Sequence, residues 1–125
     1  MRINSCNDVQ SWRIGKGLYL GFYEYLKNSK DYIFNDQLLR ATSSITNNMT
    51  EGFDRASDKE LKQFLIVSRA YSAEVRYLSH ITCADKKLNK QSRHKYEDMT
   101  IDILKFLIGF IKKLTINNKL QAARP

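Results

Sequence analysis

Residues 96–114 read YEDMTIDILKFLIGFIKKL, and the spacing of their apolar side chains decides the fold. Apolar residues recur here at steps of three and four, which places them on one face of an α-helix. The seam consists of Tyr96, Met99, Ile103, Phe106, Leu107, Phe110 and Leu114, and Ile108 and Ile111 widen it. The pattern predicts a helix over about 90–116, capped by Asn89, with a frayed tail over 117–125.

Three more stretches show helical periodicity, and they predict helices over about 8–27, 32–53 and 58–83. The third begins with a capping box, Ser57 followed by Glu60. Breakers are scarce, because the one proline is Pro125 and glycine occurs five times. Since the loops are short, consecutive helices should be antiparallel. We therefore expect an all-α fold, an up-down-up-down four-helix bundle forming a single domain over 1–125.

The second predicted helix contains many residues that are poor helix formers, with small polar side chains over 42–50. Such residues on an interior helix indicate close backbone approach and buried hydrogen bonds. The first predicted helix is apolar on two sides, with Ile14, Leu18 and Tyr25 forming a second stripe. A helix with two apolar sides needs two partners, which suits a bundle member that also meets another subunit.

Positive charge is concentrated in the last third of the chain. Residues 1–85 hold eleven Lys or Arg against ten Asp or Glu, whereas residues 86–125 hold ten against three, with no acid after Asp102. This asymmetry predicts a polyanionic partner, such as a nucleic acid. The alternative is a basic protein whose charge only keeps it soluble.

Two basic features are candidates for nucleic-acid binding. In the third predicted helix, seven-residue steps place three cations on one face: Lys62, Arg69 and Arg76. At the following loop and helix start, a cluster contains Lys86, Lys87, Lys90, Arg93, His94 and Lys95. Cations at a helix N-terminus oppose the helix dipole, so they need another reason to be there. Both features would contact phosphates without reading sequence, and each is also compatible with a merely solvated face.

A polar zone of the second and third helices includes Asn48, Glu51 and Glu74, whose side chains we expect to face inward or toward a neighbouring helix. A buried carboxylate needs a partner. The candidates are Arg55, one turn after Glu51, and in reserve Arg40 and Arg69. We interpret Asn48, Glu51, Arg55 and Glu74 as a structural polar network. A pair of catalytic carboxylates, Glu51 and Glu74, is the minor alternative.

No motif indicates an enzyme, a cofactor, a metal or a small-molecule substrate. The two histidines, His80 and His94, fall on different predicted helices and match no metal-binding spacing. Cys6 and Cys83 should lie at opposite ends of the bundle, too far apart for a disulfide. The N-terminus has no apolar run, and 103–111 is too short to span a bilayer. We expect a cytoplasmic protein without a membrane segment.

The run RATSSITNNMTEG over 40–52, then Arg55, Glu60, Phe64-Leu65, Ser72 and Glu74, resembles the signature of the 23S rRNA intervening-sequence proteins. The resemblance covers about 7–115. Five positions depart from that signature: Thr46, Met49, Thr50, Tyr71 and Val75. The resemblance implies a four-helix bundle assembled as a homopentameric barrel, without enzymatic activity. It also implies that the polar network is structural.

A related branch of this family serves as the accessory protein of diversity-generating retroelements. There a basic pentamer binds a reverse transcriptase and its template RNA. The charge of this chain favours a similar role, namely an oligomeric adaptor for RNA or for a reverse transcriptase. The alternative is a structural assembly whose partner is another protein.

Overall fold

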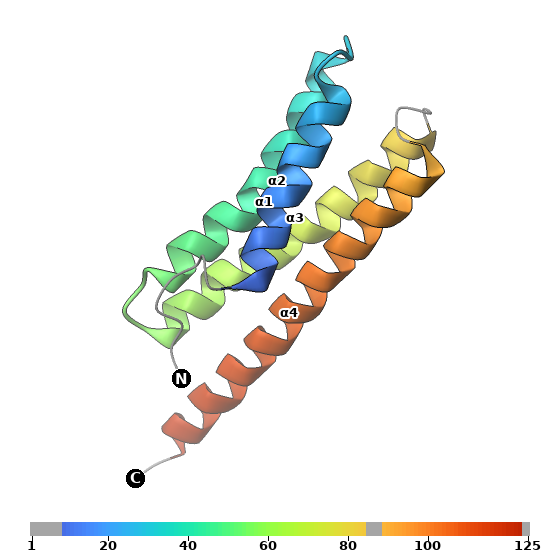
Figure 1. The fold of residues 1–125 in the computed structure, drawn as a ribbon. Helices are drawn as coiled ribbons and strands as arrows, with labels where there is room; N and C mark the ends of the chain where they lie inside the picture. Colours follow the sequence, from blue (N-terminus) through green and yellow to red (C-terminus); the bar gives the residue numbers. More distant parts are fainter. Residues whose placement is uncertain (1–8, 85–88, 124–125) are drawn as a thin grey trace.

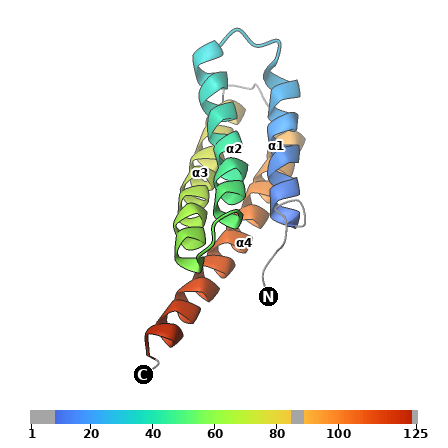
Figure 2. The same ribbon diagram turned by 90° about the vertical axis from the view of Figure 1, so that its left-hand side faces the viewer.

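The computed structural model describes residues 9–84 and 89–123, and these fold into four α-helices. They are α1 (Gln10–Leu26), α2 (Tyr32–Phe53), α3 (Asp58–Ala84) and α4 (Lys90–Ala122). Consecutive helices run in alternating directions and lie side by side, as Figures 1 and 2 show. The expected all-α four-helix bundle is therefore confirmed for the described part of the chain. None of its helices meets the length and hydropathy that crossing a membrane requires.

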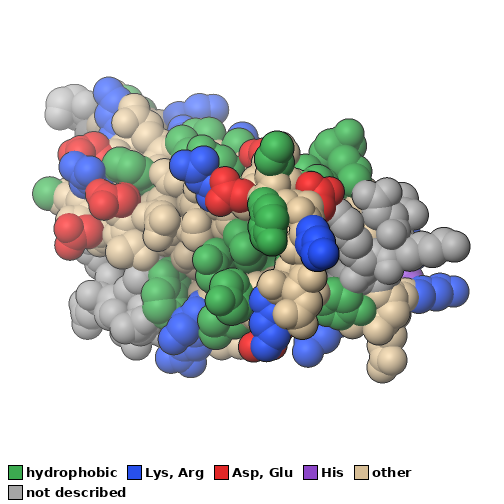
Figure 3. Space-filling view, turned by 90° about the horizontal axis from the view of Figure 1, so that it is seen from above, with side chains coloured by type: hydrophobic (Ala, Val, Ile, Leu, Met, Phe, Trp, Pro, Cys, Tyr) green, Lys and Arg blue, Asp and Glu red, His purple; other side chains and the backbone are tan. Residues whose placement is uncertain are grey.

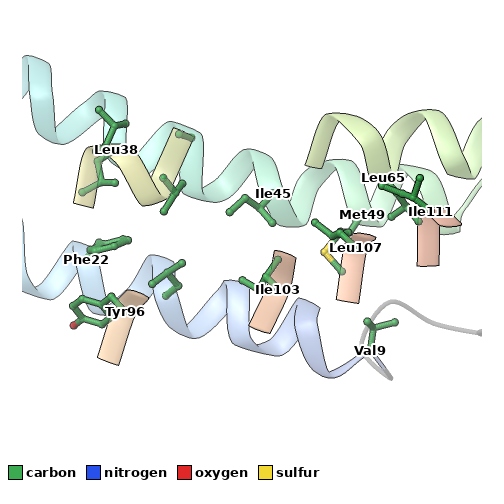
Figure 4. Close-up of a cluster of buried hydrophobic side chains, with 14 of the residues drawn as sticks. Val9, Phe22, Leu38, Ile45, Met49, Leu65, Tyr96, Ile103, Leu107 and Ile111 are labelled. Carbon is green, nitrogen blue, oxygen red and sulfur yellow. The ribbon is translucent and has the colours of Figure 1, made fainter. Parts of the chain in front are cut away.

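The four helices form a square, with α1 and α3 on one diagonal and α2 and α4 on the other. Each of α1 and α3 packs against both α2 and α4. Across the other diagonal, the Phe53 ring at the end of α2 lies 5.8 Å from the Phe110 ring of α4. The interior is filled by apolar side chains from all four helices (Figure 4). Fully buried members include Leu18, Phe22, Leu38, Ile45, Met49, Leu65, Val75, Ile103 and Leu107. Burial of this layer supplies the main driving force for folding.

The helix starts follow the local sequence signals. Asp31 accepts a hydrogen bond from the Phe34 backbone N–H at 3.3 Å, and Asn89 accepts one from Ser92 at 2.8 Å. Ser57 accepts from the Glu60 N–H at 3.1 Å, which confirms half of the capping box. The Ser57 hydroxyl also donates to the Glu60 carboxylate at 3.2 Å. The expected start of the first helix at residue 8, and Cys6, lie outside the described residues.

The fourth helix is longer than the sequence predicted. It continues to Ala122. The prediction that the chain frays from residue 117 is therefore wrong for residues 117–122. The extra turns contain neither Gly nor Pro, and Lys119 in the last turn interacts favourably with the helix dipole. Ile108 was expected to widen the apolar seam, but its side chain is 52% exposed. The inward face instead comprises Tyr96, Thr100, Ile103, Leu107, Ile111 and Leu114.

Helices α2 and α3 approach each other closely, as the small residues of α2 predicted. The Ser68 hydroxyl on α3 donates to the Ile45 carbonyl oxygen on α2 at 2.7 Å, and Ser68 is completely buried. A Cβ on Gly52 would lie 3.0 Å from the Cβ of Phe64, so α2 reaches α3 without room for a methyl group. Most other hydroxyls of α2 donate within their own helix, as Thr42 does to Leu38.

Candidate nucleic-acid interface

Helix α3 carries its basic stripe on the side that adjoins α4. Lys62, Arg69 and Arg76 each follow a buried residue by one position, so they lie about 100° around the helix from the core. Arg76 identifies the neighbour on this side, because its Nη2 lies 3.6 Å from Oε1 of Glu97 on α4. Arg69 and Arg76 are exposed and Lys62 is half-buried. The three cations predicted to share a face therefore line the junction of α3 and α4.

The first turns of α4 place two more cations at the same junction. Lys90 and Arg93 precede Glu97 by seven and four residues, which aligns all three along one side of α4. The start of the helix is fixed in place, since the Asn89 backbone N–H donates to the Tyr25 hydroxyl of α1 at 3.0 Å. Lys90 is exposed and Arg93 is half-buried. Lys86 and Lys87 lie outside the described residues.

Glu97 is the acid at the centre of this basic surface. Besides Arg76, its carboxylate meets His80, whose Nε2 lies 3.9 Å from Oε2. Arg93 lies beside the same group, and its Nε is buried without a hydrogen-bond partner. Together with Ser79 these side chains surround a closed gap that leaves no room for a water molecule. The gap is thus not a ligand pocket.

We call this surface the α3–α4 basic face, defined by Lys62, Arg69, Arg76, Lys90 and Arg93. Counting only its five cations and the Glu97 carboxylate, the net charge is +4, and Asp58, four residues before Lys62 on α3, adjoins one end of the face. Lys62 and Arg76 are fourteen residues apart on α3, which corresponds to about 21 Å along the helix axis. Part of each basic feature that the sequence separated therefore meets at one carboxylate, Arg76 from the stripe and Arg93 from the cluster.

Lys95 does not belong to the basic face. At 100° per residue it lies about 160° around α4 from Glu97, on the side facing α1. Met99, one turn later on that side, has its Cε 3.6 Å from where a Cβ on Gly17 of α1 would be. His94 is exposed on the outward surface between these two sides. A run of consecutive basic residues in a helix necessarily points in several directions, so only part of the predicted cluster converges.

The residues predicted as a polar network do not form one network among the described residues. Arg55 pairs with Glu51 at 3.1 Å, as expected, and its Nη1 lies 4.0 Å from Glu60. Glu51 was expected to face inward or toward a neighbouring helix, and it does not face inward, because its side chain is 59% exposed on the last turn of α2. Asn48 donates instead to the Ser44 carbonyl of its own helix at 2.8 Å.

Glu74, the remaining member of the predicted network, is half-buried well away from Glu51. It lines an open groove between α2 and α3 together with Arg40, Ser44 and Tyr71. Arg40 and Glu51 are eleven residues apart on α2, about 16 Å along the helix. The two carboxylates are therefore not arranged as a catalytic pair. No group of three His, Cys, Asp or Glu side chains in 9–84 and 89–123 could hold a metal ion.

Comparison with known proteins places the chain in a family. The family model described as 23S rRNA-intervening sequence protein matches residues 7–109. The chain belongs to this family. A solved structure from Bacteroides thetaiotaomicron, described as a protein of unknown function from the S23 ribosomal protein family, superposes with a TM-score of 0.76. It is 19% identical, over 82% of this chain and 98% of that one, so it supports the fold alone. No curated protein matches.

The family signature has a structural explanation in this chain. Its Glu51 and Gly52 lie in the last turn of α2, and the missing side chain of Gly52 lets this turn contact Leu61 and Phe64 of α3. Arg55 then pairs with Glu51, and its guanidinium lies 4.9 Å from the centre of the Phe64 ring. These contacts shape the turn between α2 and α3. The signature therefore accounts for how the second and third helices pack, and it lies apart from the α3–α4 basic face.

Sequence reasoning missed the role of Glu97. The signal was present, because Glu97 follows Arg93 by four residues and Lys90 by seven, and so shares their side of a helix. What the sequence did not contain was the identity of the helix on that side. Only the packing of α3 beside α4 shows that Arg76 and His80 meet the same carboxylate.

Proposed function

We propose that this chain is a non-catalytic, self-associating protein that binds RNA along the α3–α4 basic face. The observation that carries the proposal is the convergence of cations from two helices on one surface with a net charge of +4. A surface about 21 Å long can contact several successive phosphates, which are spaced by about 3.4 Å per strand in a duplex. Binding of this kind depends on charge rather than on base sequence.

Within this role, we propose that the chain is the accessory subunit of a diversity-generating retroelement. It would act as a homopentamer that binds a reverse transcriptase and its template RNA. Family membership and the concentration of cations after residue 86 support this assignment. No catalytic step is required of the chain itself, because an adaptor needs only surfaces for the RNA and for the enzyme.

A second candidate function is a structural protein whose partner is another protein. Large hydrophobic side chains on the surface favour it, since Tyr32 is 74%, Ile33 87% and Tyr77 65% exposed. Figure 3 shows one face on which hydrophobic side chains reach the surface between charged ones. Exposed apolar groups that gather on a surface are typical of protein interfaces. Co-purification of a single protein that survives nuclease treatment would favour this candidate.

The two candidates differ in their response to salt. If five cations contact phosphates of single-stranded RNA, the logarithm of the binding constant should fall against log salt with a slope of about −3.5. Fluorescence anisotropy with a labelled oligoribonucleotide at several salt concentrations measures that slope. An affinity that does not change with ionic strength would rule out the RNA-binding function.

Charge reversal tests where the RNA binds. Replacing Arg69 and Arg76 by Glu should abolish most of the affinity, because these exposed side chains contribute two of the five cations. Arg13→Glu with Lys16→Glu is the charge-matched control, since both residues are exposed on α1, which lies diagonally across the bundle from α3. The melting temperature of each variant should stay close to that of the parent. Equal losses from the double variant and the control would place the RNA elsewhere.

A further inference from the structure

His80 extends the row of basic side chains on α3. It follows Arg76 by four residues, so it lies one turn further along the same side of the helix. Its side chain is 49% exposed, and its Nε2 lies 3.9 Å from Oε2 of Glu97 on α4. Histidine is the side chain type whose charge ordinarily changes between pH 5 and 8, whereas lysine and arginine stay charged over that range. His80 thus brings a charge that depends on pH to the α3–α4 basic face.

The Glu97 carboxylate lies between His80 and Arg76. One of its oxygens, Oε1, is 3.6 Å from Nη2 of Arg76, and the other faces the imidazole. Neither distance is as short as the 2.7–3.2 Å of an N–H···O hydrogen bond, so the carboxylate is held tightly by neither partner. A charged imidazole would draw Glu97 toward itself. Arg76 would then give up part of its pairing and could turn its charge toward the outer surface.

The other groups that face His80 come from α3 and α4. They surround the closed gap and comprise Arg76 and Ser79 on α3, with Arg93 and Glu97 on α4. The two arginines oppose a positive charge on the imidazole, whereas the carboxylate favours it. Ser79 carries no charge. A phosphate bound beside Arg76 would add a second negative charge near His80 and would therefore favour the protonated imidazole.

Coupling between a proton and a phosphate works in both directions. If bound RNA favours the charged form of His80, the charged form favours bound RNA by the same factor. Acidification should therefore strengthen RNA binding, and RNA binding near neutral pH should take up protons from solution.

We propose that His80 is a pH-dependent phosphate contact of the α3–α4 basic face, so that the affinity for RNA rises as the pH falls from 8 to 5.5. This inference rests on the RNA binding of the proposed function, and it adds a residue and a form of regulation to that surface. When His80 is neutral, Glu97 offsets part of the charge of Arg76. When His80 is protonated, the face gains a cation and Arg76 is released from part of its pairing.

The other histidine provides the matched control. His94 is exposed on the outward surface of α4 and is not among the side chains around the gap. His94→Gln removes the same chemical group as His80→Gln, and it leaves the Glu97 contacts in place. The two variants therefore separate an effect of His80 from a general effect of histidine charge.

Fluorescence anisotropy at pH 8 and pH 5.5, at one low salt concentration, tests the proposal. The labelled oligoribonucleotide should lack terminal phosphates, because a terminal phosphate itself takes up a proton near pH 6. The parent should bind about fivefold more tightly at pH 5.5, the gain that one partly exposed ion pair provides. His80→Gln should lose most of this gain, and His94→Gln should keep it. Circular dichroism at both pH values verifies that each protein remains helical.

Proton uptake gives a second readout that does not depend on comparing affinities. Calorimetric titration of the RNA at pH 6.5, in two buffers that differ in ionisation enthalpy, measures how many protons accompany binding. The parent and His94→Gln should take up a fraction of a proton for each bound chain, and His80→Gln should take up less. Equal uptake in all three proteins would contradict the role of His80.

The outcomes distinguish this inference from the proposed function. RNA binding that is equally tight at both pH values, or a gain that His80→Gln retains, overturns the role of His80 and leaves RNA binding standing. A gain that is lost in His94→Gln instead also overturns the assignment to His80. A parent protein that binds the RNA at neither pH overturns both the inference and the RNA-binding function.

Discussion

Removing the negative charge of Glu97 should strengthen RNA binding. Glu97 is the carboxylate within the α3–α4 basic face, and Arg76 lies 3.6 Å from it. A phosphate bound to the outer side of Arg76 would sit about 6.5 Å from the carboxylate when a hydrogen bond of about 2.9 Å is added. The repulsion between two unit charges at that separation is about 0.6 kcal/mol at the dielectric constant of water and about 2.5 kcal/mol at 20.

An intermediate repulsion of about 1 kcal/mol corresponds to a roughly fivefold gain in affinity for Glu97→Gln. Glutamine keeps the shape of the side chain, and Arg76 is then free to turn toward the phosphate. The cost in stability should be below about 1 kcal/mol, because Arg76 and His80 are about half exposed and such ion pairs contribute little. The gain should shrink as salt is raised, since the Debye length is about 10 Å at 0.1 M.

Fluorescence anisotropy with a labelled single-stranded RNA at low and high salt measures the effect. Glu24→Gln is the matched control, because Glu24 is an exposed carboxylate on α1 that pairs with Lys27 at 2.8 Å. Both variants raise the net charge of the protein by one, but only Glu97 lies within the basic face. Equal gains in the two variants would mean that the RNA responds to total charge alone. An unchanged or weaker affinity for Glu97→Gln would refute the placement of phosphates along α3 and α4.

Three further predictions concern the packing of the bundle. Ser68→Ala should lower the free energy of unfolding by about 1 kcal/mol, because the Ser68 hydroxyl donates to the Ile45 carbonyl of α2. Ser72→Ala is the control, since its equally buried hydroxyl bonds only within α3, and it should lower the free energy of unfolding by less. Urea unfolding measures both. Gly52→Ala should destabilise the bundle by about 1–2 kcal/mol despite the better helix propensity of alanine, because the new Cβ would meet atoms of Leu61 and Phe64 on α3. An unchanged urea midpoint would show that α2 can move away from α3 at no cost. Burial raises the pKa of Tyr96, so its neutral form stabilises the fold at low pH and this contribution is lost as pH rises through the folded pKa. Tyr96→Phe should therefore flatten the decline of the melting temperature above about pH 10, and an identical decline in both proteins would contradict this assignment.

Periodicity predicted the four helices because each is long enough to reveal which side it buries. It failed at the end of α4, where polar residues without a breaker continue a helix that packs on nothing in its own chain. It also failed for Glu51, since proximity in sequence to buried residues does not settle the direction of a side chain on the last turn of a helix. Both errors concern residues at the ends of elements, where the hydrophobic pattern gives the least information.

The basic face required knowledge that no single helix contains. Arg76 and Arg93 are seventeen residues apart and belong to two patterns that the sequence offered separately. Antiparallel packing of α3 and α4 brings them beside one carboxylate, whereas Lys95, only two residues from Arg93, points toward α1. Which cations lie beside one another therefore depends on which helices are neighbours in the bundle. Packing of all four helices sets that arrangement, so no single helix reveals it.

The same reasoning separates the fold of the family from the function of this chain. The signature residues fix α2 against α3 through Gly52 and the turn at Arg55, while Lys62, Arg69 and Arg76 lie on the other side of α3. A relative could keep every signature residue, and with them the bundle, while replacing all three cations. Such a protein should fold normally and bind RNA weakly. Membership in the family therefore determines the scaffold, whereas the RNA binding that we propose for this chain rests on the charge of α3 and α4.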